Sequence, residues 1–330
     1  MKNKPKGYNY ILLYLIFISA ALISCKNTSN ENPEKQLQTA FSENSREKDL
    51  FFDISLAQWS LHKPIYAGEL SPMDFAEEAN KLGFKGIEYV SGFYKPFYEN
   101  AENPKAAFQK MLDTLKVRSE KFAVKNVLIM VDGEGPLAAS DDKIRHQAIE
   151  NHKKWVNAAE YLGAHSIRVN LQGSEEPKEW KKNSVDGLTQ LGEYAAKKNI
   201  GVIVENHGGF SSNAEMLVDV INRVNLSNVG TLPDFGNFCI TGGVHDCKKT
   251  YPRYKGVELL MPFAKAVSAK SYNFNDEGEE TKIDYVRMLQ IVKDAGYSGF
   301  IGIEYEGNEL PPTEGILATK ALLIEAGSNL

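Results

Sequence analysis

The most constraining feature of this sequence is a unit that repeats from residue 51 onward. Each unit has a short apolar segment, a polar loop and an amphipathic segment, which predict a strand, a connection and a helix. Several helix-to-strand junctions carry Gly or Asn, which can adopt the left-handed backbone of a helix end, at Gly83, Gly163, Asn199 and Gly296. Eight units share the 280 residues from Phe51 to Leu330, about 35 each. Strict alternation predicts parallel strands, and eight units predict one (β/α)8 TIM barrel over 51–330 with no second domain.

The apolar segments predict strands at 53–59, 86–90, 125–131, 166–171, 201–205, 229–233, 266–270 and 300–305. Helical patterns lie between them, for example at 71–81, 105–121, 142–161, 184–198, 213–224 and 283–295. Ser71 before Pro72, and likewise Ser184, are typical of helix starts. A doubly wound sheet is the alternative. It is disfavoured because the first strand lacks the Gly-rich turn of a dinucleotide site, so no nucleotide cofactor is expected.

The first 24 residues predict an export signal. Three lysines precede an apolar run over 10–23, which is short for a membrane span of about 20 residues and typical of a signal-peptide core. The run ends at Leu22-Ile23-Ser24-Cys25, which resembles the lipobox of bacterial lipoproteins. The resemblance implies that residues 1–24 are removed and that Cys25 carries lipid, which anchors the chain to a membrane. A plain secretory signal with a chance cysteine is the alternative.

Residues 25–50 are rich in Asn, Ser, Glu and Lys and predict a flexible lipidated tether. We therefore expect an exported protein that is lipid-anchored to a bacterial membrane and faces the periplasm or the cell surface. Removing residues 1–24 deletes three lysines and no acid, so 38 basic and 43 acidic side chains become 35 and 43, a net charge of −8. Such a body has no basic field to attract nucleic acid.

Three cysteines are too few for a disulfide scaffold or a cysteine-rich zinc module. Cys239 and Cys247 could pair in an oxidising compartment or remain free thiols, and the sequence leaves both open.

Acidic residues stand at the ends of three predicted strands, where a barrel of this kind carries its function. Glu205 ends the strand 201–205, Asp234 follows the strand 229–233, and Glu304 lies in the strand 300–305. Any one of them could be an ordinary polar residue at the start of a loop. Together they can converge above the barrel, and sites rich in carboxylate oxygens suit Mn²⁺, Mg²⁺ or a related divalent ion.

Three motifs around these acids resemble the xylose isomerase-like TIM barrels, in particular the sugar phosphate isomerase/epimerase group. They are Glu205-Asn206-His207-Gly208-Gly209, Leu232-Pro233-Asp234-Phe235-Gly236-Asn237 and Gly302-Ile303-Glu304-Tyr305-Glu306-Gly307, and the resemblance covers roughly 54–324. It implies a divalent ion held by two glutamates, one aspartate and one histidine, with Glu205, Asp234 and Glu304 as the carboxylates. It further implies that the two glutamates act as acid and base.

The chain departs from that family at the strand 266–270, where a ligand histidine is usual. Ser268 or Lys270 stands there instead. An ammonium group cannot ligate a metal, so Lys270 is expected to neutralise the carboxylates or to contact substrate. His207 is the candidate for the missing nitrogen ligand, because it shares the face of its strand with Glu205.

Further substrate-binding candidates lie at other strand ends. They are Trp59, His62, Glu88, Arg168, His207, Asn237 and Lys270. Trp59 and His62 could line the mouth, with the indole against a sugar face, or pack in the core. Glu88 and Arg168 could bind sugar hydroxyls or a carboxylate, or form a buried ion pair.

The expected chemistry is proton abstraction next to the carbonyl of a free sugar or keto-sugar, giving epimerisation or isomerisation through an enediolate. A lyase that acts on a keto-glycoside or a cyclic keto-polyol is one alternative, and a non-catalytic carbohydrate-binding lipoprotein is another. DNA-repair endonucleases share the barrel, but six histidines and the charge of −8 disfavour that function. The sequence does not reveal the substrate, the metal or whether the chain self-associates.

Overall fold

The computed structural model describes Glu47, residues 50–243 and residues 246–330, which fall within one compact unit over 43–330. The predicted signal peptide 1–24, Cys25 and nearly all of the tether 25–50 lie outside the described residues. Eight parallel strands form one sheet in the order β6-β5-β4-β3-β2-β1-β10-β9. They are β1 Asp53–Ala57, β2 Gly86–Val90, β3 Lys125–Met130, β4 Ser166–Val169, β5 Gly201–Glu205, β6 Val229–Leu232, β9 Val267–Ser271 and β10 Phe300–Tyr305.

The sheet closes on itself, because the chain after β6 meets the chain that enters β9. Parallel bridges join Thr231 to Ala264 and Asp234 to Ser268. The amide of Ser268 donates to the carbonyl of Pro233 at 2.9 Å, and the amide of Phe235 donates to the carbonyl of Ser268 at 3.0 Å. The predicted (β/α)8 barrel is thereby confirmed, with all eight predicted strands present within two residues of their expected ends.

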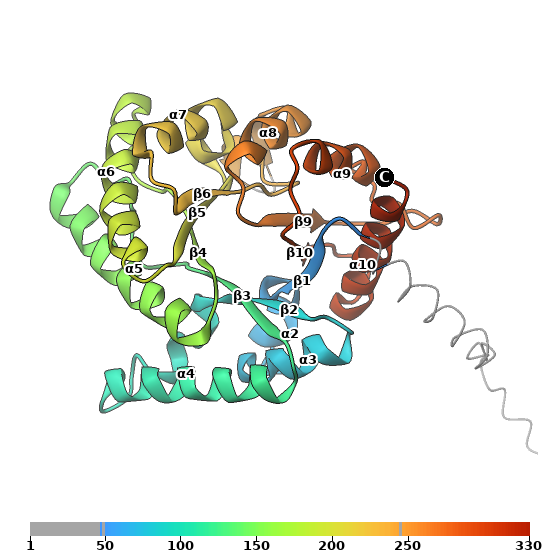
Figure 1. The fold of residues 1–330 in the computed structure, drawn as a ribbon, viewed down its shortest axis with the longest axis horizontal. Coiled ribbons are helices and arrows are strands. Elements are labelled where there is room, and N and C mark those ends of the chain that lie inside the picture. The colour runs from blue at the N-terminus through green and yellow to red at the C-terminus, as the bar shows by residue number, and fades with distance from the viewer. Residues whose placement is uncertain (1–46, 48–49, 244–245) are drawn as a thin grey trace, which may run out of the picture. The chain divides into compact units, whose positions relative to one another are not determined.

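Helices surround the strands, as Figure 1 shows. They are α2 His62–Tyr66, α3 Phe75–Lys81, α4 Pro104–Lys121, α5 Asp142–Leu162, α6 Pro177–Ala196, α7 Ala214–Val224, α8 Arg253–Leu260, α9 Tyr285–Asp294 and α10 Pro312–Ser328. The predicted start at Ser71 is confirmed, since its side chain caps a short 3-10 turn that precedes α3. The predicted start at Ser184 is wrong. α6 begins at Pro177, whose fixed φ suits a first helical position, and Ser184 is buried in the middle of the helix.

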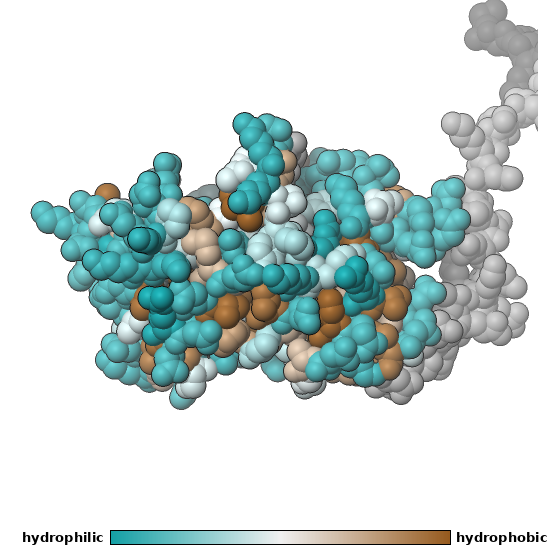
Figure 2. All heavy atoms as spheres, turned by 90° about the horizontal axis from the view of Figure 1, so that it is seen from above, coloured by the Kyte–Doolittle hydropathy of each residue, from teal (hydrophilic) through white to brown (hydrophobic). Residues whose placement is uncertain are grey.

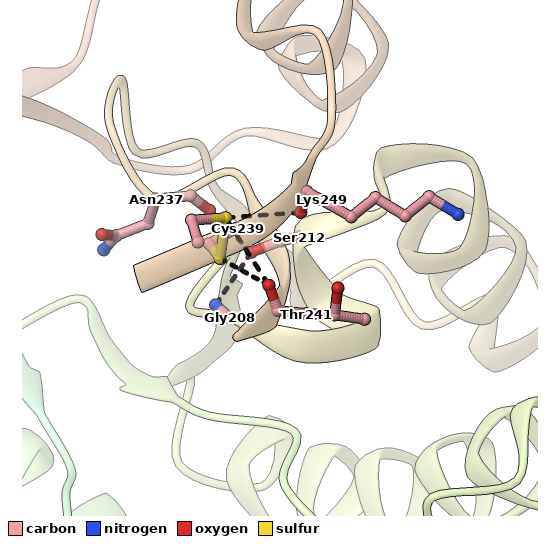
Figure 3. Close-up of a disulfide and its surroundings, with 7 residues drawn as sticks. Gly208, Ser212, Asn237, Cys239, Thr241 and Lys249 are labelled. Atoms are coloured by element: carbon pink, nitrogen blue, oxygen red, sulfur yellow. Dashed lines mark hydrogen bonds between the residues drawn. A yellow bond between two sulfur atoms is a disulfide. The ribbon is translucent and has the colours of Figure 1, made fainter. Parts of the chain in front are cut away.

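A two-stranded antiparallel hairpin, β7 Cys239–Gly243 with β8 Asp246–Thr250, interrupts the repeat after β6. The sequence did not predict it, because the pattern of one strand and one helix per unit has no place for two extra strands. A disulfide joins Cys239 to Cys247 across the hairpin, with the two Cα atoms 5.7 Å apart (Figure 3). The structure thus settles the pairing that the sequence left open.

The main apolar core consists of side chains of the strands and of the helices around them, including the fully buried Trp155 and Trp180. On the side where α7 and α8 lie, the outer surface is mostly hydrophilic, with smaller hydrophobic patches between the polar side chains (Figure 2). No helix in the described part of the chain is long and apolar enough to span a bilayer.

Candidate active site

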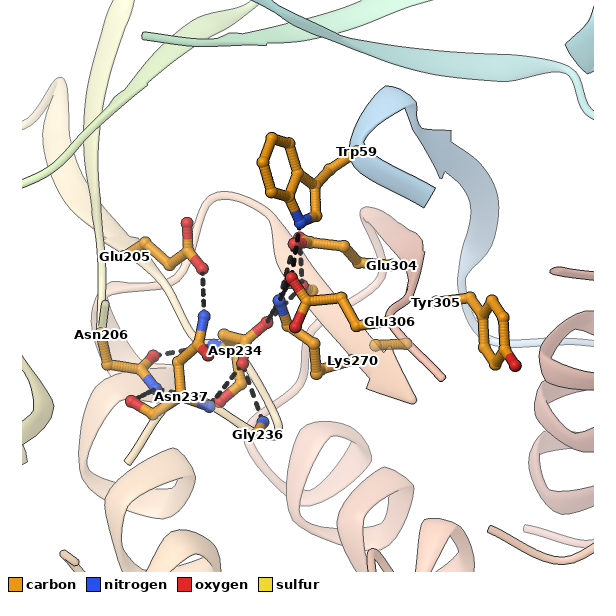
Figure 4. Close-up of polar contacts among 12 residues, drawn as sticks. Trp59, Glu205, Asn206, Asp234, Gly236, Asn237, Lys270, Glu304, Tyr305 and Glu306 are labelled. Carbon is orange, nitrogen blue, oxygen red and sulfur yellow. Dashed lines mark hydrogen bonds and ion pairs between the residues drawn. The ribbon is translucent and has the colours of Figure 1, made fainter. Parts of the chain in front are cut away.

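Three buried carboxylates meet at the mouth of the barrel, above the C-terminal ends of the strands. Glu205 ends β5, Asp234 follows β6, and Glu304 lies in β10, and one oxygen from each lies within 4.8 Å of the others. Asp234 lies between Glu205 and Glu304 (Figure 4). Side chains alternate along a strand, so Glu304 and Glu306 face this cluster whereas Tyr305 points away from it (Figure 4). The predicted convergence of the three acids is therefore present.

Lys270 is buried beside these acids. It pairs in register with Glu304 on the neighbouring strand, and its Nζ lies 2.6 Å from Oε1 of Glu304. The same atom lies 3.3 Å from Oε1 of Glu306 and 4.0 Å from Oδ2 of Asp234. Burial by itself lowers the pKa of Lys270, but the charges of Glu304 and Asp234 outweigh it and raise that pKa well above its usual value. The ammonium group is therefore held in its charged form among the carboxylates.

Glu205 is held by groups from two other parts of the chain. Its Oε1 accepts a hydrogen bond from the side-chain amide of Asn237 at 2.9 Å. Its Oε2 lies 2.9 Å from Nε of Arg168 but is not aligned for a hydrogen bond, so it remains without one. Arg168 also binds Oδ1 of Asp132 through Nη1, at 2.7 Å. Burial raises the pKa of Glu205 to about 7, against the opposing charge of Arg168.

Both carboxylate oxygens of Asp234 accept hydrogen bonds from protein donors. Its Oδ1 accepts from the amides of Gly236 and Asn237 at 2.8 and 2.7 Å, and its Oδ2 accepts from the hydroxyl of Ser268 at 2.6 Å. Burial nevertheless raises the pKa of Asp234 to about 7. Asn206 fixes this loop, since its side chain accepts from the Asp234 amide at 2.8 Å and donates to the Asp234 carbonyl at 3.0 Å.

The donor set fits a divalent cation. Four carboxylates contact only two cations, Arg168 and Lys270. The carboxylates are those of Glu205, Asp234, Glu304 and Glu306, and Asp132, which also contacts Arg168, adds a fifth negative charge. A divalent ion would balance that excess of negative charge, and hard cations prefer carboxylate oxygens. The group that could hold a metal consists of Glu205, Asp234 and Glu304, with Lys270 beside them in place of a fourth ligand. His207 lies outside that group and is exposed at the cavity wall, so its role as a ligand stays a prediction.

A cavity of about 680 Å³ opens over the cluster. Aromatic rings form one wall: Trp59 and Phe93 are stacked with ring centres 5.7 Å apart, and the exposed Tyr66 packs edge-on against Phe93 at 5.5 Å. The indole Nε1 of Trp59 donates to Oε1 of Glu306 at 2.5 Å, which links this wall to the charged cluster (Figure 4). The cavity has the volume and mixed lining of a small-molecule site.

Other predicted residues have different surroundings. His62 stacks on Trp59 at 4.7 Å and its Nδ1 lies 2.6 Å from the Trp59 carbonyl oxygen, but it is not among the cavity-lining residues. Glu88 is fully buried inside the barrel, where its Oε1 accepts from Ser55 at 2.6 Å and its Oε2 has no hydrogen-bond partner. Burial raises the pKa of Glu88 to about 8. A β-carbon on Gly302 would stand 2.3 Å from Oε1 of Glu88, so any larger residue there would displace the buried carboxyl group.

The residues of the mouth that the sequence reasoning missed include Asp132, Arg253, Tyr272 and Glu306, together with the wall residues Tyr66 and Phe93. A signal existed for Glu306, which shares the parity of Glu304 along its strand, and for Asp132, which directly follows the predicted strand 125–131. No local pattern distinguished Arg253, which lies beyond the unpredicted hairpin.

Solved structures with the same fold include several carbohydrate enzymes. A D-tagatose 3-epimerase-like protein aligns with a TM-score of 0.63 at 17% identity, over 83% of this chain and 97% of its own. The IOLI protein with a bound zinc atom aligns with a TM-score of 0.62 at 17% identity, over 84% and 99%. A 3-keto-D-glucoside 4-epimerase from E. coli aligns with a TM-score of 0.57 at 13% identity, over 77% and 94%. At these identities the likeness shows the fold.

Sequence comparisons give the family. No curated protein matches the chain. The family model described as xylose isomerase-like TIM barrel matches residues 76–326, about three quarters of the chain, and this range includes the three clustered acids. The chain therefore belongs to the xylose isomerase-like TIM barrel family.

Proposed function

We propose that the protein is a divalent-metal-dependent sugar isomerase or epimerase that moves a proton next to the carbonyl of a free sugar or keto-sugar. The observation that carries the proposal is the placement of Glu205 and Glu304 on two sides of Asp234, in a buried cluster next to a cavity that Glu304 lines and that has an aromatic wall (Figure 4). Such a reaction needs two proton-transfer groups that reach one substrate carbon from different directions.

Glu205 has the properties of the proton-accepting group. Its Oε2 has no hydrogen bond, and a pKa of about 7 lets the carboxyl group take up and release a proton near neutral pH. Arg168 holds the side chain from one side and Asn237 from the other, so the carboxyl group is fixed in orientation. Glu304 is fixed by Lys270 at 2.6 Å and serves as the second proton-transfer group.

The metal would be held by Glu205, Asp234 and Glu304, and Mn²⁺ or Mg²⁺ is the expected ion. When bound, a divalent ion supplies Lewis-acid stabilisation of the negative charge that develops on the carbonyl oxygen. Lys270 supplies a second positive charge next to the same oxygens. Support also comes from the fold neighbours, which include two sugar epimerases or epimerase-like proteins and one protein with a zinc atom.

Solvent exchange tests this function directly. The full protein is incubated in D₂O with Mn²⁺ or Mg²⁺ and a panel of keto-sugars, and incorporation of deuterium at carbon is followed by NMR. We expect incorporation into at least one sugar, and a loss of about 10²–10⁴-fold in rate in Glu205→Gln and Glu304→Gln. Glu258→Gln, which removes an exposed carboxylate on α8, is the matched control and keeps the rate. No incorporation with any sugar and ion would overturn the proposal.

Lys270 favours a second candidate, a non-catalytic carbohydrate-binding protein, because it stands where a metal ligand is usual and already neutralises Glu304. In that case both glutamine variants would retain carbohydrate affinity and the wild type would show no exchange. A lyase acting on a keto-glycoside would show exchange together with release of the leaving group, so product analysis separates it from an epimerase.

We also propose that the mature chain begins at Cys25, carries lipid there and is anchored outside the cytoplasm. The lysine-rich start, the apolar run and the lipobox-like motif support this assignment. The Cys239–Cys247 disulfide agrees with it, since stable disulfides are typical of oxidising compartments. Mass spectrometry of the mature protein tests it, and an unmodified Cys25 or an intact residue 1 would contradict it.

A further inference from the structure

Arg253 is a cation at the cavity wall that forms no ion pair with any of the described residues. It is the first residue of α8, directly after the β7–β8 hairpin, and it lines the cavity over the acidic cluster. Its Nη1 is shielded from solvent but makes no hydrogen bond, and no carboxylate lies within 4.0 Å of the guanidinium among the residues that the structure places. A buried donor without a partner is costly, so a partner that arrives with a ligand would be favoured.

The other two cations of the mouth are occupied. Arg168 binds Asp132 and Glu205, and Lys270 binds Glu304 and Glu306. Arg253 stands apart from them, near Tyr272. Burial and the charge of Asp234 raise the pKa of the Tyr272 hydroxyl, and the positive charge of Arg253 opposes that rise. The guanidinium is thus near the acidic cluster without being used to neutralise it.

A free guanidinium matters most in a site with surplus negative charge. Glu304, Glu306 and Asp132 all line the cavity, and they would repel an anionic ligand unless a cation met its charge. Arginine is suited to this task, because its planar fork can donate two parallel hydrogen bonds to the oxygens of a carboxylate, sulfate or phosphate group. A neutral sugar would leave the buried donor unpaired or paired only with a hydroxyl.

We infer that the ligand of this cavity is a sugar derivative that carries an anionic oxygen group, and that Arg253 binds this group while the rest of the molecule lies over Glu205, Asp234 and Glu304. This inference rests on the proposed function for the position of the reacting carbon. It adds the class of substrate, an acidic sugar, and a residue that selects it.

Equilibrium binding tests the inference separately from catalysis. Titration calorimetry on the full protein compares D-glucuronate, D-glucose 6-sulfate and D-glucose 6-phosphate with uncharged D-glucose. We expect at least one of the three anions to bind about tenfold or more tightly than glucose. In Arg253→Gln this anion should lose about 10–100-fold in affinity, while the affinity for glucose changes little. The anion that shows the effect identifies the group as carboxylate, sulfate or phosphate.

Two further variants keep the result interpretable. Arg253→Lys retains the positive charge but loses the planar pair of guanidinium donors. It should therefore keep part of the wild-type anion affinity, even if Arg253→Gln is poorly folded. Lys255→Gln removes the same charge from the same helix at an exposed position, where the lysine pairs with Glu215 at 2.6 Å, and should bind every probe as the wild type does. Equal loss for glucose and for the anions in Arg253→Gln, or no anion that binds more tightly than glucose, would overturn the inference. Deuterium exchange in a neutral keto-sugar would in that case still leave the proposed function intact.

Discussion

The two halves of the barrel mouth carry different kinds of side chain, aromatic in one half and charged in the other. The half above β1 and β2 presents three aromatic rings to the cavity, the stacked pair Trp59 and Phe93 and the edge-on Tyr66. The half above β5, β6, β9 and β10 presents buried carboxylates together with Lys270. An aromatic wall binds an apolar sugar face without fixing charge, whereas a charged wall can move protons. Under the proposed function, the aromatic half would hold the sugar ring and the charged half would react with it.

The halves also differ in how a buried acid is accommodated. On the charged side Glu304 has an ammonium group at 2.6 Å and Asp234 has three donors. On the other side Glu88 has one hydroxyl donor and an oxygen without a partner. We therefore expect the charged half to need Lys270 for its stability. We expect Glu88 to stabilise the fold only while its carboxyl group is protonated.

Removing Lys270 should have the largest effect on stability. Lys270→Met leaves Glu304 buried without its cation, and breaking a buried pair in this way costs about 3–5 kcal/mol of unfolding free energy. Urea denaturation in the presence of EDTA measures it. Lys255→Met, which breaks the exposed pair with Glu215, is the control and should cost about 0–1 kcal/mol. Equal losses in the two variants would show that the charged half does not depend on its buried cation.

Replacing Glu88 should have an intermediate effect that depends on pH. The pKa of Glu88 is raised in the folded state to about 8, so its contribution to stability is complete below about 4.5 and is lost as the pH rises through 8. Each pKa unit corresponds to about 1.4 kcal/mol. Because water can enter when the group ionises, we expect a loss of about 2–3 kcal/mol between pH 5 and pH 9.

Glu88→Gln keeps the shape of the side chain and cannot ionise, so its unfolding free energy should fall less over that range than that of the wild type. Denaturation curves at pH 5, 7 and 9 for both proteins measure the difference. Parallel pH profiles would mean that Glu88 keeps its charge when buried, and the contrast between the two halves would then fail.

Changing the aromatic wall should have the smallest effect, and on binding rather than on turnover. Phe93→Leu keeps an apolar side chain but removes one ring of the wall against which a sugar face would pack. A ring contact is worth about 0.5–1.5 kcal/mol, so KM should rise about 2–10-fold with kcat unchanged. Steady-state kinetics with a sugar that shows exchange measure both constants. Phe108→Leu, an edge-on partner of Trp155 away from the mouth, is the matched control and should change neither. A fall in kcat alone would place Phe93 in the chemistry and not in the binding.

Much of this arrangement could be predicted from short stretches of sequence. The eight strands followed from the repeat, because the alternation of strand and helix is a local pattern. The three acids followed from their positions at strand ends, because parallel neighbours bring those ends to one edge. The start of α6 was missed because Ser184 is of a residue type common at helix starts, whereas the helix already begins at Pro177 and Ser184 is buried within it. The hairpin was missed because it adds two strands to a single unit of the repeat.

Local patterns were enough to predict the barrel, its mouth and the three acids at the strand ends, since periodicity and side-chain parity act over a few residues. What those acids contact became known from the folded chain alone. Lys270 and Glu304 are 34 residues apart in the chain and Arg168 and Glu205 are 37 apart, so they meet only once the strands pair in register. The same holds for Arg253, which lines the cavity together with residues of the β7–β8 hairpin that precedes it. Pairing of distant charges is a property of the closed barrel, and no local pattern encodes it.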